Sequence, residues 1–124
     1  MSVSHEGFKS YYVRIDFDAA QGFTFHPHCL DIPTDILATI TWFTDNPHLK
    51  FTGFQWCNEN EHLSEHPLIR GNYMVGAAQT MVAGDDIYWK YQVKAEVTIG
   101  DRSRHVESTP CTAATNGLPR IHPN

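Results

Sequence analysis

The sequence has few basic residues, no long apolar run and only three cysteines. Lys and Arg number 9 against 14 Asp and Glu, and the formal net charge is −5. Because nucleic-acid backbones are bound by positive stripes, we expect no nucleic-acid partner. No apolar segment is long enough to span a bilayer, and residues 1–6 lack the apolar stretch of a signal peptide. We therefore expect a cytoplasmic protein with no membrane partner.

Cysteine is too scarce for a disulfide framework. Cys29, Cys57 and Cys111 cannot all pair within one chain, and 124 residues form a core large enough to fold without a covalent link. The simplest expectation is that all three thiols are reduced.

Helical periodicity is also lacking, whereas apolar residues recur with period two. The longest alternation covers residues 87–99 and predicts a half-buried strand with a fixed register. In residues 49–56, Gly53 disturbs the period as a β-bulge does. Residues 57–76 show no clear pattern and are expected to form a long loop. The other expected strands are 10–17, 23–26, 28–32, 36–44, 79–82 and 102–107.

Many short strands separated by turn signals predict an all-β fold, a two-sheet antiparallel β-sandwich. An open barrel is the alternative. Residues 1–109 are expected to form this domain. Residues 110–124 contain three prolines and no periodicity, which predicts an extended C-terminal tail.

Several segments taken in order resemble a known family. They are Gly22-Phe-Thr-Phe-His-Pro, Ile40-Thr-Trp-Phe-Thr-Asp and Phe51-Thr-Gly-Phe, together with the first strand and the long strand followed by a turn. In these features the chain resembles the DP-EP family of small bacterial proteins over nearly the whole body. The resemblance implies an immunoglobulin-like β-sandwich and, for some members, self-cleavage at an Asp-Pro bond near the C-terminus. Here the corresponding position reads Ser108-Thr109-Pro110, so the Asp is missing.

A self-processing function would need another group in the tail. The hydroxyl of Thr109, which precedes Pro110, can attack the preceding carbonyl, but it is a poor nucleophile without a base. Asn116 is followed by glycine, the pair least hindered from closing a succinimide ring, although a simple turn is the favoured explanation of this pair. Lys94 and Glu96 are the candidate supporting groups, since they would lie on the polar side of the long strand.

Eight histidines suggest a metal site as a third interpretation. The candidate ligands are His26, His28, Cys57 and His62, because imidazole and thiolate suit zinc or copper. His26 and His28 would share a strand face. The spacings match neither a blue-copper loop nor a zinc site built from close cysteine pairs, so we expect surface histidines and no cofactor.

Three tyrosines fall on polar strand phases or in a loop, namely Tyr12, Tyr73 and Tyr88, and they indicate a binding or oligomer face. Because the scissile Asp is missing, the primary expectation is a non-catalytic binding or assembly module, without a specified ligand. A homo-oligomer is expected, formed through this face or by strand addition of the tail to a neighbour's sheet edge. The alternatives are a self-processing endopeptidase that cuts or crosslinks its own C-terminal tail, and a metal-binding protein.

Overall fold

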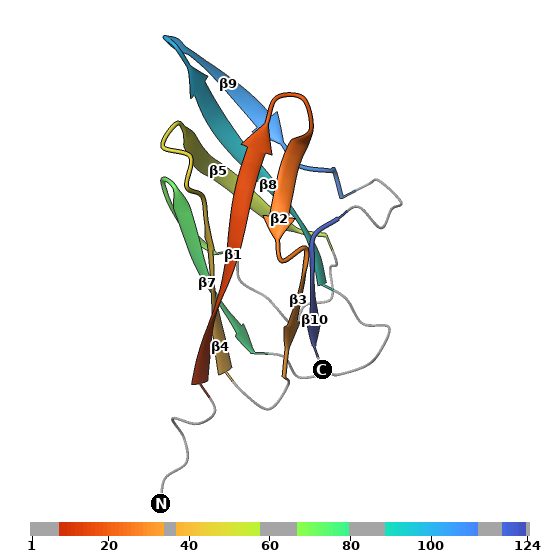
Figure 1. Ribbon diagram of the computed structural model, residues 1–124. Helices are drawn as coiled ribbons and strands as arrows, with labels where there is room; N and C mark the ends of the chain where they lie inside the picture. The colour runs from red at the N-terminus through yellow and green to blue at the C-terminus, as the bar shows by residue number, and fades with distance from the viewer. Residues whose placement is uncertain (1–7, 34–36, 58–66, 80–88, 112–117, 124) are drawn as a thin grey trace, which may run out of the picture.

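The computed structural model describes residues 8–33, 37–57, 67–79, 89–111 and 118–123 (Figure 1). These ranges contain ten β-strands and no helix, which confirms the all-β class. No helix in them is therefore long and apolar enough to cross a membrane. The strands are β1 (Phe8–Asp18), β2 (Gly22–His26), β3 (Cys29–Ile32), β4 (Leu37–Phe43), β5 (Leu49–Trp56), β6 (Leu68–Arg70), β7 (Tyr73–Gln79), β8 (Trp89–Ile99), β9 (Arg102–Glu107) and β10 (Arg120–Pro123).

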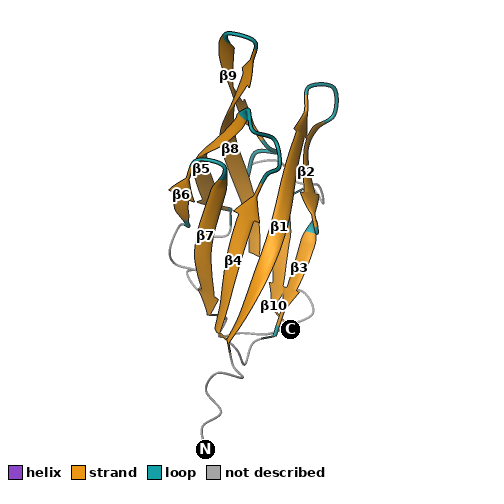
Figure 2. Cartoon of the chain, turned by 60° about the vertical axis from the view of Figure 1, so that its left-hand side comes forward, coloured by secondary structure: helices purple, strands orange, loops and turns teal. Residues whose placement is uncertain are grey.

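The strands form two open sheets (Figure 2). Sheet A has the order β2-β1-β4-β7-β6, and sheet B has the order β3-β10-β8-β5 with β9 also paired to β8. The expectation of antiparallel sheets is wrong at two places, since β1 with β4 and β3 with β10 are parallel pairs. The chain passes from β2 in sheet A to β3 in sheet B without reversing its direction (Figure 1). It therefore reverses only twice between β1 and β4, once after β1 and once after β3, and β4 runs alongside β1 in the same direction.

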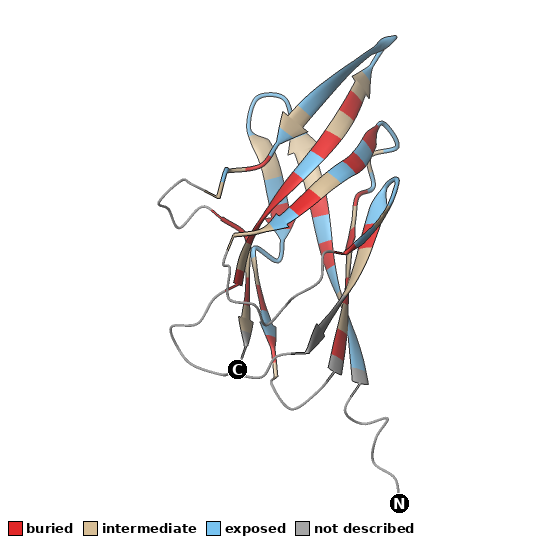
Figure 3. Ribbon diagram, turned by 180° about the vertical axis from the view of Figure 1, so that it is seen from behind, coloured by how far each residue is buried: buried red, intermediate tan, exposed pale blue. Residues whose placement is uncertain are grey.

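One hydrophobic core lies between the two sheets. The residues of β8 at the alternating positions 89, 91, 93, 95 and 97 are all buried, as the period-two pattern predicts (Figure 3). Trp42 of sheet A contacts Phe54 and Tyr91 of sheet B, with ring centroids 4.9 and 5.6 Å apart. These aromatic contacts join the sheets into a sandwich-like body. Burial raises the pKa of the Tyr91 phenol above its ordinary value of 10.0.

Strands lie in two segments for which the sequence pattern predicts none. Within the expected loop at 57–76, β6 and β7 form a hairpin with Arg70 opposite Tyr73, and Gly71 in the turn has φ of 68°. Within residues 110–124, β10 lies inside sheet B between β3 and β8. Leu118 and Ile121 are buried, so this end of the chain belongs to the core. The bulge expected at Gly53 is confirmed by a register shift between Phe51 and Gly53.

The expectation of three reduced thiols is wrong for two of them. Cys57 and Cys111 form a disulfide with a Cα–Cα distance of 5.1 Å, and Cys29 is free. Cys57 directly follows β5, and its N–H donates to the carbonyl of Lys90. The chain passes the same part of sheet B on its way from β9 to β10, which brings together two cysteines 54 residues apart.

Candidate functional site

The outer face of sheet A carries a patch of exposed aromatic, aliphatic and basic side chains. Strand alternation turns these residues away from the core, because their neighbours Val13, Ile40, Trp42 and Met74 are buried. We call this patch the tyrosine face. Its members are Tyr12, Arg14 and Asp16 of β1, His26 of β2, Thr41 and Phe43 of β4, Leu68 and Arg70 of β6, and Tyr73 and Val75 of β7.

Strand register arranges the tyrosine face in two rows. The first row crosses all five strands, since Arg14 lies opposite His26 and Phe43, Phe43 opposite Tyr73, and Tyr73 opposite Arg70. In the second row, the same ladders place Tyr12 opposite Thr41, Thr41 opposite Val75, and Val75 opposite Leu68. Side chains directly opposite one another in a sheet are in contact range. The face is therefore a continuous surface held by backbone ladders.

The exposure of its large side chains sets this face apart. Tyr12 is 60% exposed, Leu68 56% and Tyr73 42%. In the described part of the chain only one other large hydrophobic residue, Ile99, is classed as exposed. An apolar surface gathered in one place, rather than scattered, is typical of interaction sites.

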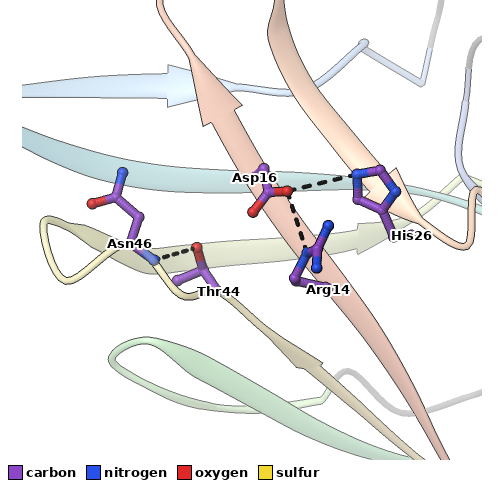
Figure 4. Close-up of polar contacts among 5 residues, drawn as sticks. All are labelled: Arg14, Asp16, His26, Thr44 and Asn46. Atoms are coloured by element: carbon purple, nitrogen blue, oxygen red, sulfur yellow. Dashed lines mark hydrogen bonds and ion pairs between the residues drawn. The ribbon is translucent and has the colours of Figure 1, made fainter.

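Charged groups flank the aromatic centre, and Figure 4 shows those on β1 and β2. Arg14 Nε lies 3.3 Å from Asp16 Oδ2, and His26 Nε2 lies 3.6 Å from the same oxygen. Both partners of the Arg14–Asp16 pair are more than two-fifths exposed, so the pair contributes about 0–1 kcal/mol to stability. At the other end of the row, Arg70 donates a hydrogen bond to the carbonyl of Ile69. With His26 neutral, the face has one surplus positive charge, whereas the whole chain has −5.

The outer face of sheet B has a different character. Lys94 lies opposite Glu107 of β9, and Glu96 lies opposite both Lys50 of β5 and His105 of β9. Pairs of opposite charge across a ladder stabilise a sheet modestly. The structure thus places Lys94 and Glu96, the candidate supporting groups, in a balanced polar surface.

The segment that contains Thr109 and Pro110 is fixed on both sides. Ser108 exchanges two hydrogen bonds with Val93: its N–H donates to the Val93 carbonyl (2.9 Å), and its Oγ accepts from the Val93 N–H (2.8 Å). Gln92 Nε2 also donates to the Ser108 carbonyl oxygen (3.4 Å). Cys111 is held by the disulfide. Thr109 and Pro110 therefore span two anchored points.

These two residues line a cavity of about 290 Å³ beside β2. Phe23 and Phe25 form its apolar wall, and His28 and Glu107 contribute polar groups. The structure therefore brings Thr109 and Pro110 together with an imidazole and a carboxylate. Lys94 and Glu96 are not among the lining residues, and Asn116 lies outside the described residues.

The metal candidates are separated. His26 ends β2 and faces Asp16, whereas His28 lies beyond the strand and lines the cavity, so the expectation of a shared strand face is wrong. Cys57 is in the disulfide and offers no thiolate. His62 lies outside the described residues. Among residues that the structure describes, no group of three or more His, Cys, Asp or Glu is placed to hold a metal ion.

The sequence pattern did not predict several members of the tyrosine face. Leu68 and Arg70 lie on a strand within a segment expected to be a loop. Gly71-Asn72, directly before Tyr73 and Met74, is nevertheless a usable signal for a two-residue hairpin turn. Tyr88 lies outside the described residues.

In comparisons with known proteins, no family model matches this sequence, and no curated protein matches it.

Proposed function

We propose that this chain is a non-catalytic protein-binding module whose binding surface is the tyrosine face. The observation that carries the proposal is the gathering of Tyr12, Tyr73 and Leu68 on one face, each more than two-fifths exposed. Tyr and Arg are enriched among residues that dominate binding energy, because they combine apolar area with hydrogen-bonding groups. The backbone ladders of sheet A hold these groups in place before binding, which lowers the entropy cost of association.

The charge on this face favours an acidic partner. Arg14 and Arg70 flank the aromatic row, and Asp16 is the one acidic residue of the face. A partner surface with an apolar centre and carboxylates around it would match this arrangement. A two-fold axis through the face would instead bring the arginines of two copies towards each other. The homo-oligomer expected from the sequence stays a prediction, which sedimentation velocity of the purified chain tests directly.

Selection from a randomised peptide display library tests the binding function. We expect enriched peptides to combine large apolar residues with Asp or Glu, and to lose binding to a Tyr12→Ser/Tyr73→Ser variant. Lys50→Ser/Thr52→Ser on the outer face of sheet B is the matched control and should bind as the parent does. Enriched peptides that bind the tyrosine variant undiminished would refute the proposal.

The family resemblance remains part of this proposal. Its quoted segments fall on β2, β4 and β5, the last with the glycine bulge. An immunoglobulin-like arrangement and a bacterial origin follow from the same resemblance. The missing Asp before Pro110 is the reason to propose binding rather than cleavage.

We propose self-cleavage as a second candidate function, because Thr109 lines a cavity with His28 and Glu107. The Thr109 hydroxyl would bond to the Ser108 carbonyl carbon as the peptide C–N bond breaks. Its proton would pass, through His28 or Glu107, to the released amine. Gln92 Nε2 already donates to the carbonyl oxygen on which negative charge would develop. Water would then hydrolyse the resulting ester and separate the two segments.

Intact mass of fresh and aged protein tests this candidate. Because Cys111 remains bonded to Cys57, a chain cut beside Thr109 stays in one piece without reductant and gains the mass of one water. With reductant it separates into two fragments whose masses locate the bond. His28→Ala should slow the cut, whereas His48→Ala, in another part of the molecule, should not. An unchanged mass in the aged sample would eliminate self-cleavage.

A further inference from the structure

A second cavity, of about 370 Å³, lies where three turns meet. The turns between β1 and β2, β4 and β5, and β8 and β9 lie towards the same end of the molecule, opposite the start of β1 (Figure 2). Phe17, Val97 and Ile99 provide apolar walls, and Asn46, His48 and Thr98 provide polar groups. The volume falls within the range of small-molecule sites, which are mostly apolar with a few polar groups.

Hydrogen bonds fix the shape of this cavity. The Thr44 Oγ1 accepts the N–H of Asn46 (3.1 Å), as Figure 4 shows. The Asn46 Oδ1 accepts the N–H of His48 (2.9 Å), and the His48 carbonyl accepts the N–H of Thr98 on β8 (2.9 Å). The β4–β5 turn is therefore tied to the strand that forms the opposite wall. Within the described residues the His48 ring itself makes no hydrogen bond, and in its neutral form it offers one acceptor nitrogen.

The charge around the cavity is negative. Each of the three turns carries an exposed aspartate directly next to a lining residue: Asp18 precedes Ala19, Asp45 precedes Asn46, and Asp101 follows Gly100. The lining contains no Lys or Arg. Arg102, which follows Asp101 and lies opposite Ile99 in the β8–β9 ladder, is one positive charge against these three aspartates. A low-dielectric apolar wall next to carboxylates favours a ligand that is apolar at one end and positive at the other.

We propose that this cavity binds small primary amines with an aromatic or branched apolar body. The apolar body packs against Phe17, Val97 and Ile99. The ammonium group lies at the rim near the aspartates, where the His48 ring accepts one of its hydrogen bonds. This site is separate from the tyrosine face and does not depend on the proposed protein-binding function.

Titration of the purified full chain with three matched probes, followed by calorimetry and by backbone amide NMR, tests the proposal. The probes are 3-phenylpropylamine, 3-phenylpropanol and 3-phenylpropanoate, which differ in charge and share one apolar body. The amine should bind most tightly and the carboxylate about tenfold more weakly or not at all. Amide shifts should concentrate at residues 17–19, 46–48 and 97–100. Equal binding of amine and carboxylate, shifts elsewhere, or no binding of the amine would overturn the proposal.

Variants separate the two parts of the site. Asp45→Asn/Asp101→Asn should weaken the amine about three- to fivefold and leave the alcohol unchanged, since exposed charges contribute up to about 1 kcal/mol. Ile99→Lys should abolish amine binding, because it removes an apolar wall and adds a like charge, and Ile99→Val should retain it. Ile99 is 62% exposed, so neither change disturbs the core. Tyr12→Ser is the control outside the cavity and should bind the amine as the parent does.

Discussion

Removal of the Cys57–Cys111 disulfide should destabilise the fold substantially. The two cysteines are 54 residues apart in sequence, and closing a loop of that length in the unfolded chain corresponds to about 4 kcal/mol of stabilisation at 25 °C in the chain-entropy model. We expect a Cys57→Ser/Cys111→Ser variant, or the reduced parent, to lose about this much free energy of unfolding. With a typical urea dependence for a small domain, the unfolding midpoint would fall by roughly 1.3 to 4 M.

Urea unfolding followed by tryptophan fluorescence measures this shift. Cys29→Ser is the matched control, because Cys29 is free and should leave the midpoint nearly unchanged. A loss below about 1 kcal/mol in the double variant would refute the loop-entropy reasoning. The result also tests the cellular location, because disulfides persist mainly in oxidising compartments. The cytoplasmic location expected from the sequence stays a prediction. A reduced chain that unfolds at 37 °C would make that prediction untenable.

Three further predictions concern stability. Ile121→Ala should lower the free energy of unfolding in urea by about 2–5 kcal/mol, because Ile121 is fully buried; no loss would mean that β10 is dispensable. Gly71→Ala should lower the free energy of unfolding by about 1–2 kcal/mol, since Gly71 has φ of 68°, and an unchanged melting temperature would contradict this turn geometry. Gly76→Ala is not a suitable control, because an added Cβ would lie close to Pro67. The free energy of unfolding should fall above about pH 10 by up to about 1.4 kcal/mol per pH unit, because Tyr91 then loses its phenolic proton in the unfolded chain and keeps it in the folded one. Equal urea midpoints at pH 9 and pH 11 would contradict this.

The period-two pattern predicts the strands but not how they pair. The bounds of β5 and β9 match the expected ranges, and the buried phase of β8 follows from the alternation. Alternation states which side of a strand faces the core and carries no information on the neighbour or its direction. The parallel pairs arise because β3 crosses to the other sheet, which is a long-range property of the path. β10 has only four residues, ends in a proline and is too short to show a period.

The candidate site shows the same division between local and long-range information. Polar strand phase alone predicts that Tyr12 is exposed, and the structure agrees. That Tyr12 and Tyr73 share a face depends on β4 lying between β1 and β7, which no local pattern reveals. His28 and Thr109 line one cavity although they are 81 positions apart in the sequence. Sequence analysis could therefore nominate side chains for function and could not assemble them.

The two candidate functions use different parts of the molecule and can be separated by experiment. The tyrosine face belongs to sheet A, whereas the segment from Ser108 to Cys111 is attached to sheet B. A cut beside Thr109 would leave β10 in its ladder between β3 and β8, with the disulfide still joining the fragments. Cleavage would then neither release the C-terminal strand nor uncover the tyrosine face. Peptide binding should accordingly be the same for intact and cut chains, and a change on cleavage would mean that the two sheets are coupled through their shared core.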